Sequence, residues 1–108
     1  MKPWEIYTWE FPDAESHPAV ILGTESRIAC KPKVNVLFCS SHRALRSAEA
    51  LEIILDESDG LDWKTLCKCD LVFAVPKEQL THKRGIVTIE RRRLIAERVI
   101  RGLGLAGL

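Results

Sequence analysis

Hydrophobic and polar residues alternate along several short stretches of the chain, which is the pattern of β-strands that bury one face. We predict strands at residues 5–10, 18–22, 34–39 and 65–75 (EIYTWE, PAVIL, VNVLFC and TLCKCDLVFAV). The last strand is long enough to bend, and we place the bend near Asp70. It ends at Pro76, because proline has no N–H to donate to a neighbouring strand. Residues 12–16 form a polar break between two strands, and residues 23–26 have the composition of a turn.

Helical spacing is clear only toward the C-terminal end of the sequence. Apolar residues recur at the interval of one helix face over 94–100, Thr88 is the expected N-cap, and Gly102 and Gly104 end the helix. Residues 44–55 fit a helix or a strand, and periodicity does not decide between them. The elements together predict a mainly β (β-rich α+β) fold, in which a bent antiparallel sheet or barrel packs against the terminal helix.

Length and composition favour one globular domain spanning residues 1–108. The chain is 46% hydrophobic and 29% charged, which is ordinary for a folded domain. Its longest apolar runs are about five residues, whereas a membrane-spanning helix needs about twenty. The first residues carry two acids and no long apolar stretch, so we expect no signal peptide, no membrane segment and a cytoplasmic protein.

Charge is distributed unevenly along the chain, although the net charge is only +1. Residues 1–25 hold one base against five acids, whereas residues 83–101 hold seven bases against two acids. Such a basic segment can attract a phosphate backbone or an acidic partner protein. It can equally be the solvated face of a helix.

The chain has four cysteines: Cys30, Cys39, Cys67 and Cys69. Three of them stand in predicted strands, where a free cysteine behaves as a small apolar residue. A Cys-x-Cys pair without further ligand pairs is a weak zinc signal. We therefore expect reduced, structural cysteines, with no metal and no cofactor.

Three groups of polar residues stand beside the predicted strands, where a rigid scaffold would hold reactive side chains. His17 is either a plain loop histidine or a group that gives and takes a proton near neutral pH. Residues 40–43 (SSHR) are either a polar turn or a phosphate site. Lys68 and Asp70 share one strand face, as a partly exposed ion pair or as a matched cation and base.

The order of these features resembles the MazF/PemK toxins of bacterial toxin–antitoxin systems. The resemblance runs over nearly the whole chain. It is carried by EIYTWEFPD, HPAVIL, VNVLFCSS, GLDWKTLCKCDLVFAVPKEQL and the closing GIVTIERRRLIAERVIRGLGL. No single segment is specific, but their common order and spacing are.

The resemblance implies a small SH3-like barrel of about five to seven antiparallel strands with a C-terminal helix. Members of this family are homodimers that cut single-stranded RNA without a metal. A cognate antitoxin binds them through a largely disordered tail and blocks the RNA groove. We therefore expect single-stranded RNA, an antitoxin and a second copy of the chain as partners.

The family's site residues carry over only in part. The arginine before proline falls on His17, the threonine falls on Ser40, and Arg-Cys-Asp falls on residues 68–70 (KCD). The polar residues that follow in the family fall on residues 71–74 (LVFA), which are all apolar. This departure puts activity and sequence preference in question.

RNA cleavage without a metal needs a base for the 2′-hydroxyl, an acid for the leaving 5′-oxygen and a cation for the phosphorane. We assign Asp70 as the base, His17 as the acid and Lys68 as the cation, with the first two roles interchangeable. Side chains that would hold the RNA backbone are Ser40, Ser41, Arg43 and Arg27. The mechanism predicts a bell-shaped pH profile, cyclic-phosphate ends and no loss of activity with chelator.

Two other functions compete with this one. A catalytically decayed barrel could bind a protein partner, as the related CcdB toxins do, and the missing polar residues at 71–74 favour it. A nucleic-acid-binding barrel could use the basic helix and stack bases on Trp4, Trp9 or Trp63. Tryptophan is, however, more common in cores and interfaces.

Overall fold

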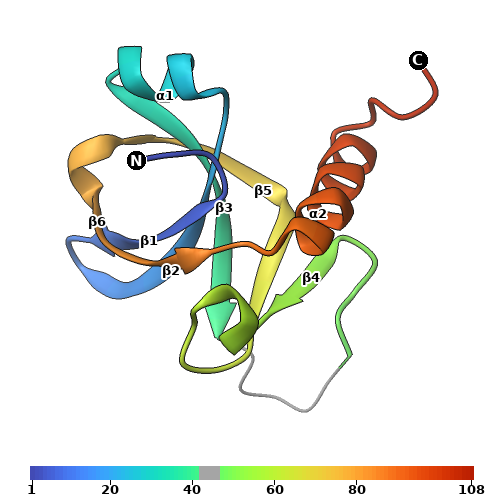
Figure 1. The fold of residues 1–108 in the computed structure, drawn as a ribbon, viewed down its shortest axis with the longest axis horizontal. Helices are drawn as coiled ribbons and strands as arrows, with labels where there is room; N and C mark the ends of the chain where they lie inside the picture. Colours follow the sequence, from blue (N-terminus) through green and yellow to red (C-terminus); the bar gives the residue numbers. More distant parts are fainter. Residues whose placement is uncertain (42–46) are drawn as a thin grey trace.

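The computed structural model describes residues 1–41 and 47–108. Over these residues one six-stranded antiparallel sheet curls around a core in the order β4-β5-β3-β2-β1-β6 (Figure 1). Its strands are β1 (Glu5–Phe11), β2 (Ala14–Leu22), β3 (Lys33–Ser41), β4 (Glu52–Leu55), β5 (Thr65–Pro76) and β6 (Leu80–Ile86). The helices are α1 (Glu25–Cys30), α2 (Ile89–Gly102) and the 3-10 turns η1 (Glu57–Asp59) and η2 (Lys77–Gln79). The predicted mainly β architecture with a terminal helix is confirmed.

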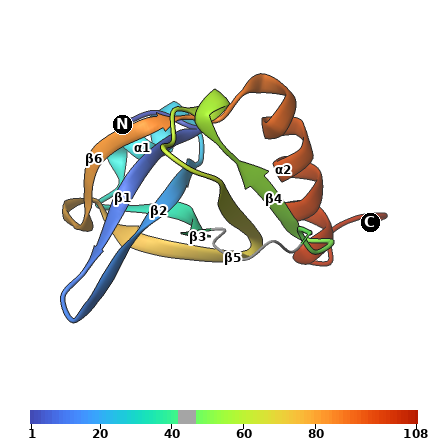
Figure 2. The same ribbon diagram turned by 90° about the horizontal axis from the view of Figure 1, so that it is seen from below.

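Several predicted boundaries are wrong, and each has a local cause. The polar stretch 12–16 is mostly strand, because the β1–β2 hairpin extends beyond the rest of the sheet and exposes its tip (Figure 2). The turn predicted at 23–26 runs into α1, whose six residues are too few to show a period. Strand β6 has polar residues on both faces and was not predicted. The ambiguous segment 44–55 contains strand β4, and its first three residues lie outside the described part.

The sheet buries apolar side chains on both of its faces, and neighbouring residues of β2 belong alternately to two clusters. Val20 packs inside the curl, where Ile95 of α2 closes the cluster. Ala19 and Ile21 pack on the opposite face, where Ile28 of α1 covers them. The cysteines are free, as expected: Cys30 is exposed, and the other three are buried in the first cluster.

Helix α2 is attached to the sheet through two aspartates of the η1 segment. Asp59 has a fully buried side chain, and it accepts hydrogen bonds from the backbone N–H groups of Asp56 (3.0 Å) and Thr88 (2.9 Å). Arg91 Nη1 lies 2.5 Å from Asp59 Oδ2 and 2.7 Å from Asp56 Oδ1. Thr88 is the N-cap residue, as predicted, but its hydroxyl makes no capping bond within the described residues. We call Asp56, Asp59 and Arg91 the helix clasp.

No helix in residues 1–41 and 47–108 has the length and apolar character needed to cross a membrane.

Candidate functional site

The two charged residues predicted on strand β5 line one open pocket of about 490 Å³. Asp70 is exposed there, and Lys68 lies in the same wall. The pocket is completed by β4, by the segment before it and by Leu71; its lining residues are Glu49, Ala50, Leu51, Glu52, Lys68, Asp70 and Leu71. Lys68 forms its ion pair with Glu52 of β4. We call this hollow the lysine–aspartate pocket.

Strand β5 changes its pairing at this pocket. On one side of the change Cys39 of β3 pairs with Cys67, and on the other Leu37 pairs with Val72. Four residues of β5 therefore face a single residue of β3, so the strand bends here, as predicted near Asp70 (Figure 1). The N–H of Cys69 turns instead to the carbonyl of Leu51 (2.9 Å). The bend places Lys68, Asp70 and Leu71 in the wall of the pocket, while Cys69 points into the core.

His17 lies in a second pocket, of about 200 Å³, with Ser40 and Ser41. Pro18 explains the opening, because it has no N–H for the sheet and the β2–β3 pairing runs only from Ala19 to Leu22. Ala14 and His17 are therefore paired to β1, with a register shift between them, but not to β3. Glu15 and Ser16 complete the lining, and we call this hollow the histidine pocket.

Aromatic rings hold the imidazole in the histidine pocket. The ring centroid of His17 is 4.7 Å from that of Phe38 and 5.7 Å from that of Phe11. Ser41 Oγ accepts a hydrogen bond from Trp63 Nε1 at 3.3 Å. His17 is half-buried as a result and presents its ring beside two hydroxyl groups.

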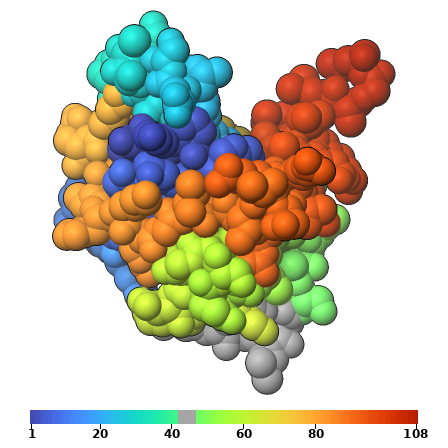
Figure 3. All heavy atoms as spheres, in the orientation of Figure 1, coloured from blue at the N-terminus to red at the C-terminus, as the bar shows by residue number. Residues whose placement is uncertain are grey.

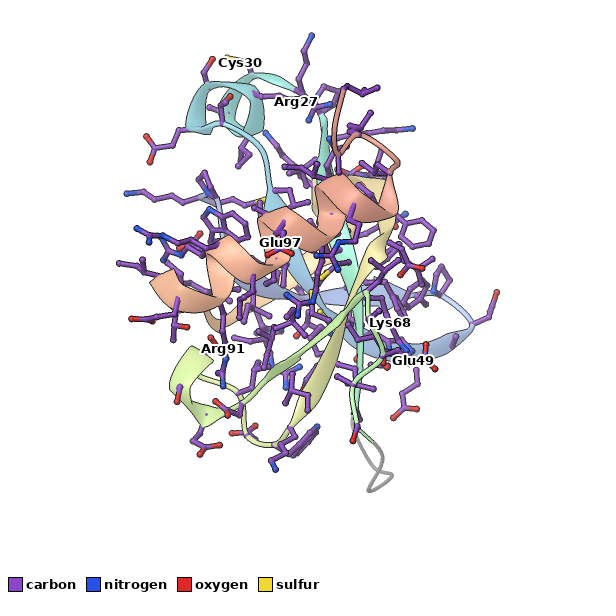
Figure 4. The ribbon with its side chains drawn as sticks, turned by 90° about the vertical axis from the view of Figure 1, so that its right-hand side faces the viewer. Arg27, Cys30, Glu49, Lys68, Arg91 and Glu97 are labelled. Carbon is purple, nitrogen blue, oxygen red and sulfur yellow. The ribbon has the colours of Figure 1, made fainter. Side chains whose placement is uncertain are left out.

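The predicted site residues therefore fall into two groups, with Lys68 and Asp70 in one pocket and His17, Ser40 and Ser41 in the other. Within the described residues the two pockets share no lining side chain. Arg27 belongs to neither group: it lies on α1, at the end of the molecule away from Lys68 (Figure 4). Arg43 lies outside the described residues.

The apolar residues at 71–74 form an exposed edge rather than a core strand. Leu71 and Phe73 are 39% and 42% exposed, and the ring of Phe73 packs 5.3 Å from that of Trp9. Trp9 itself is a core residue, whereas Trp63 is exposed and Trp4 is partly buried against the core.

Glu52 is a charged residue of the lysine–aspartate pocket that sequence reasoning missed. Its side chain is only 4% exposed, and its carboxylate is the ion-pair partner of Lys68. The available signal was a charged residue inside the apolar run of β4 (EIIL). Among residues 1–41 and 47–108 no group of three or more His, Cys, Asp or Glu side chains is arranged to hold a metal ion.

The curled antiparallel sheet, its terminal helix and its two open pockets define a small β-barrel protein with acid–base groups at its surface. A family model described as "PemK-like, MazF-like toxin of type II toxin-antitoxin system" matches residues 2–103. The chain belongs to that family. No curated protein matches its sequence.

Solved structures share the fold at low sequence identity. The Mycobacterium tuberculosis toxin MazF-mt6 has a TM-score of 0.80 and 20% identity, covering 94% of this chain and 97% of its own. An endoribonuclease in complex with its cognate antitoxin, from a mycobacterial species, has a TM-score of 0.85 and 18% identity, covering 100% and 99%. A further mycobacterial endoribonuclease has a TM-score of 0.83 and 18% identity, covering 100% and 95%.

Proposed function

We propose that this chain is a toxin of the endoribonuclease type, which cuts single-stranded RNA to 2′,3′-cyclic phosphate and 5′-hydroxyl ends without a metal. The observation that carries the proposal is the lysine–aspartate pocket, in which an exposed carboxylate and an ammonium share one open wall of a family barrel. The names of the structurally similar endoribonucleases agree with it.

The chemistry assigns one step to each group. Asp70 takes the proton of the 2′-hydroxyl, whose oxygen attacks phosphorus, and His17 protonates the leaving 5′-oxygen. Lys68 stabilises the extra negative charge of the phosphorane. Ser40 and Ser41 stand beside His17 and donate hydrogen bonds to the RNA backbone. Because His17 and Asp70 lie in separate pockets, the scissile phosphate must lie across strand β3, which separates β2 from β5.

The test is incubation of the purified chain with a long single-stranded RNA in the presence of EDTA. Cuts at a recurring short sequence are the expected result. The 5′-hydroxyl ends should accept phosphate from a polynucleotide kinase directly, and the 3′ ends should be ligated only after the cyclic phosphate has been opened and removed. Loss of all cleavage on adding EDTA would contradict the metal-free mechanism. Intact RNA at high enzyme concentration would favour the alternative function, a binding module, to which the exposed Leu71 and Phe73 also point.

We further infer a cytoplasmic homodimer that a cognate antitoxin inhibits. Helix α2 and the residues after it carry large apolar side chains in solvent, among them Ile89 (63% exposed), Ile100 (46%) and Leu103 (52%). Figure 3 shows the end of the chain, after α2, standing away from the body of the molecule. Sedimentation equilibrium should give about twice the chain mass of 12.2 kDa, and a single-chain mass at high concentration would contradict the dimer.

A further inference from the structure

We propose that Glu52 is a positioning residue of the ribonuclease site, whose buried carboxylate fixes the ammonium of Lys68 in the wall of the lysine–aspartate pocket. The inference rests on the proposed function and adds to it a residue that touches neither phosphate nor leaving group.

The sheet itself brings the two side chains together. Glu52 and Lys68 are direct partners in the antiparallel pairing of β4 with β5, so both side chains leave the sheet on the same face. Glu52 Oε2 accepts a hydrogen bond from Lys68 Nζ, and Oε1 accepts one from the backbone N–H of Glu49 at 2.9 Å. Each carboxylate oxygen is therefore held by a donor.

Burial of the Glu52 carboxylate restricts the movement of the Lys68 ammonium that pairs with it. The Glu52 side chain is 4% exposed, and a carboxylate in such surroundings is costly unless it is paired. Any movement of Lys68 away from Glu52 would break the hydrogen bond between the ammonium and this buried carboxylate. The ammonium, which otherwise ends a flexible four-carbon stem, is consequently confined to one place.

Lys68 nevertheless remains able to bind substrate. Its side chain is 23% exposed and lines the open pocket beside Asp70. An ammonium has three N–H donors, and the bond to Glu52 uses one of them, so two remain for phosphate oxygens. A cation that is already in place stabilises a transition state better than one that must first be ordered.

Removing the Glu52 charge should have two effects of opposite direction. The pocket becomes less negative, so RNA binds more tightly and KM falls. The Lys68 ammonium loses its fixed place, so kcat falls, by about tenfold to a hundredfold if displacement of a reacting group by about an ångström has its usual effect. The fall in kcat is the result that indicates positioning, because a residue that only makes the pocket more negative would change substrate binding, and therefore KM, alone.

Glu5 provides a matched control within the chain. It too accepts a hydrogen bond from the backbone N–H three residues before it (Lys2, 2.7 Å) and pairs with a lysine (Lys83, 2.7 Å). Its side chain is 9% exposed, and it lines neither pocket. The Glu5→Gln variant therefore loses the same kind of buried pair at a place unrelated to the proposed site.

The experiment measures kcat and KM on a single-stranded RNA for the native chain, Glu52→Gln and Glu5→Gln, with urea unfolding of each. We expect a lower kcat and a lower KM for Glu52→Gln alone. In a Lys68→Met background the Glu52→Gln change should alter kcat less than about twofold, since the glutamate acts only through the lysine.

Each contrary result has its own meaning. A kcat for Glu52→Gln equal to that of Glu5→Gln would overturn the inference and leave the proposed function standing, whereas an inactive native chain would overturn both. If Glu52→Gln does not fold, Glu52→Asp is measured in its place. This variant keeps the negative charge but moves the carboxylate back by the length of one methylene group. The Glu52→Asp variant should also have a lower kcat than the native chain, and a kcat equal to the native value would overturn the inference.

Discussion

Replacing Asp70 with asparagine is expected to lower the rate of RNA cleavage by about a hundredfold or more, because an amide of the same shape cannot accept the proton of the 2′-hydroxyl. Asp70 is exposed at the bend of β5, so the substitution should leave the fold unchanged. The measurement is the single-turnover rate on a short single-stranded RNA that the native chain cuts.

Asp62→Asn is the control for this variant, because Asp62 is also an exposed aspartate but lines neither pocket. It should cut at the native rate. If Asp70→Asn also retained the native rate, Asp70 would have no role in the chemistry, and the base would have to be sought elsewhere.

Replacing Arg91 with leucine is expected to lower the free energy of unfolding by about 3 kcal/mol, because it leaves the buried carboxylate of Asp59 without its cation. The figure is at the low end for such a loss, since two backbone N–H groups still donate to Asp59. Urea denaturation measures it. Arg101→Leu is the control: its pair with Glu97 is more than half exposed on both sides and should cost less than about 1 kcal/mol.

The helix clasp also predicts how the difference in unfolding free energy between the native chain and Arg91→Leu depends on pH. The guanidinium of Arg91, followed by the backbone N–H of Ser58, lowers the pKa of Asp56 to about 2. The unfolded chain has a carboxyl pKa of about 3.9, so the clasp contributes its full stability above about pH 4 and loses it as the pH falls toward 2. The native chain should therefore lose more stability over this range than Arg91→Leu, and equal losses would contradict the clasp.

The period of two along the strands was sufficient to predict most of the sheet, because one face of each strand is buried and the side chains alternate. It failed for β6, where Leu80 is buried but the following residues are half-buried or exposed on both faces. It also failed for residues 44–55, because the four residues of β4 are too few to distinguish the period of a strand from that of a helix. In both places pairing with a distant strand, rather than local pattern, determines the structure.

The candidate site also has one part that the local sequence predicts and another part that depends on pairing between distant strands. Lys68 and Asp70 were predicted together because two positions on one strand share a face, which is local information. The meeting of His17 with Ser40 depends on the end of the β2–β3 pairing at Pro18, and that of Lys68 with Glu52 on the register of β4. Register between distant segments is set by the whole hydrophobic pattern, so neither contact could be predicted from its own neighbourhood.

The pairing of β1 with β6 has a consequence for how the protein is made. Glu5 lies opposite Ile86, so the first strand of the sheet has no partner on one side until the last strand has left the ribosome. Contacts between such distant residues also close slowly, because a long loop must be ordered before they form. The sheet is therefore completed only after residues 80–86 have left the ribosome, and every nascent chain passes through an interval in which β1 lacks its second partner strand.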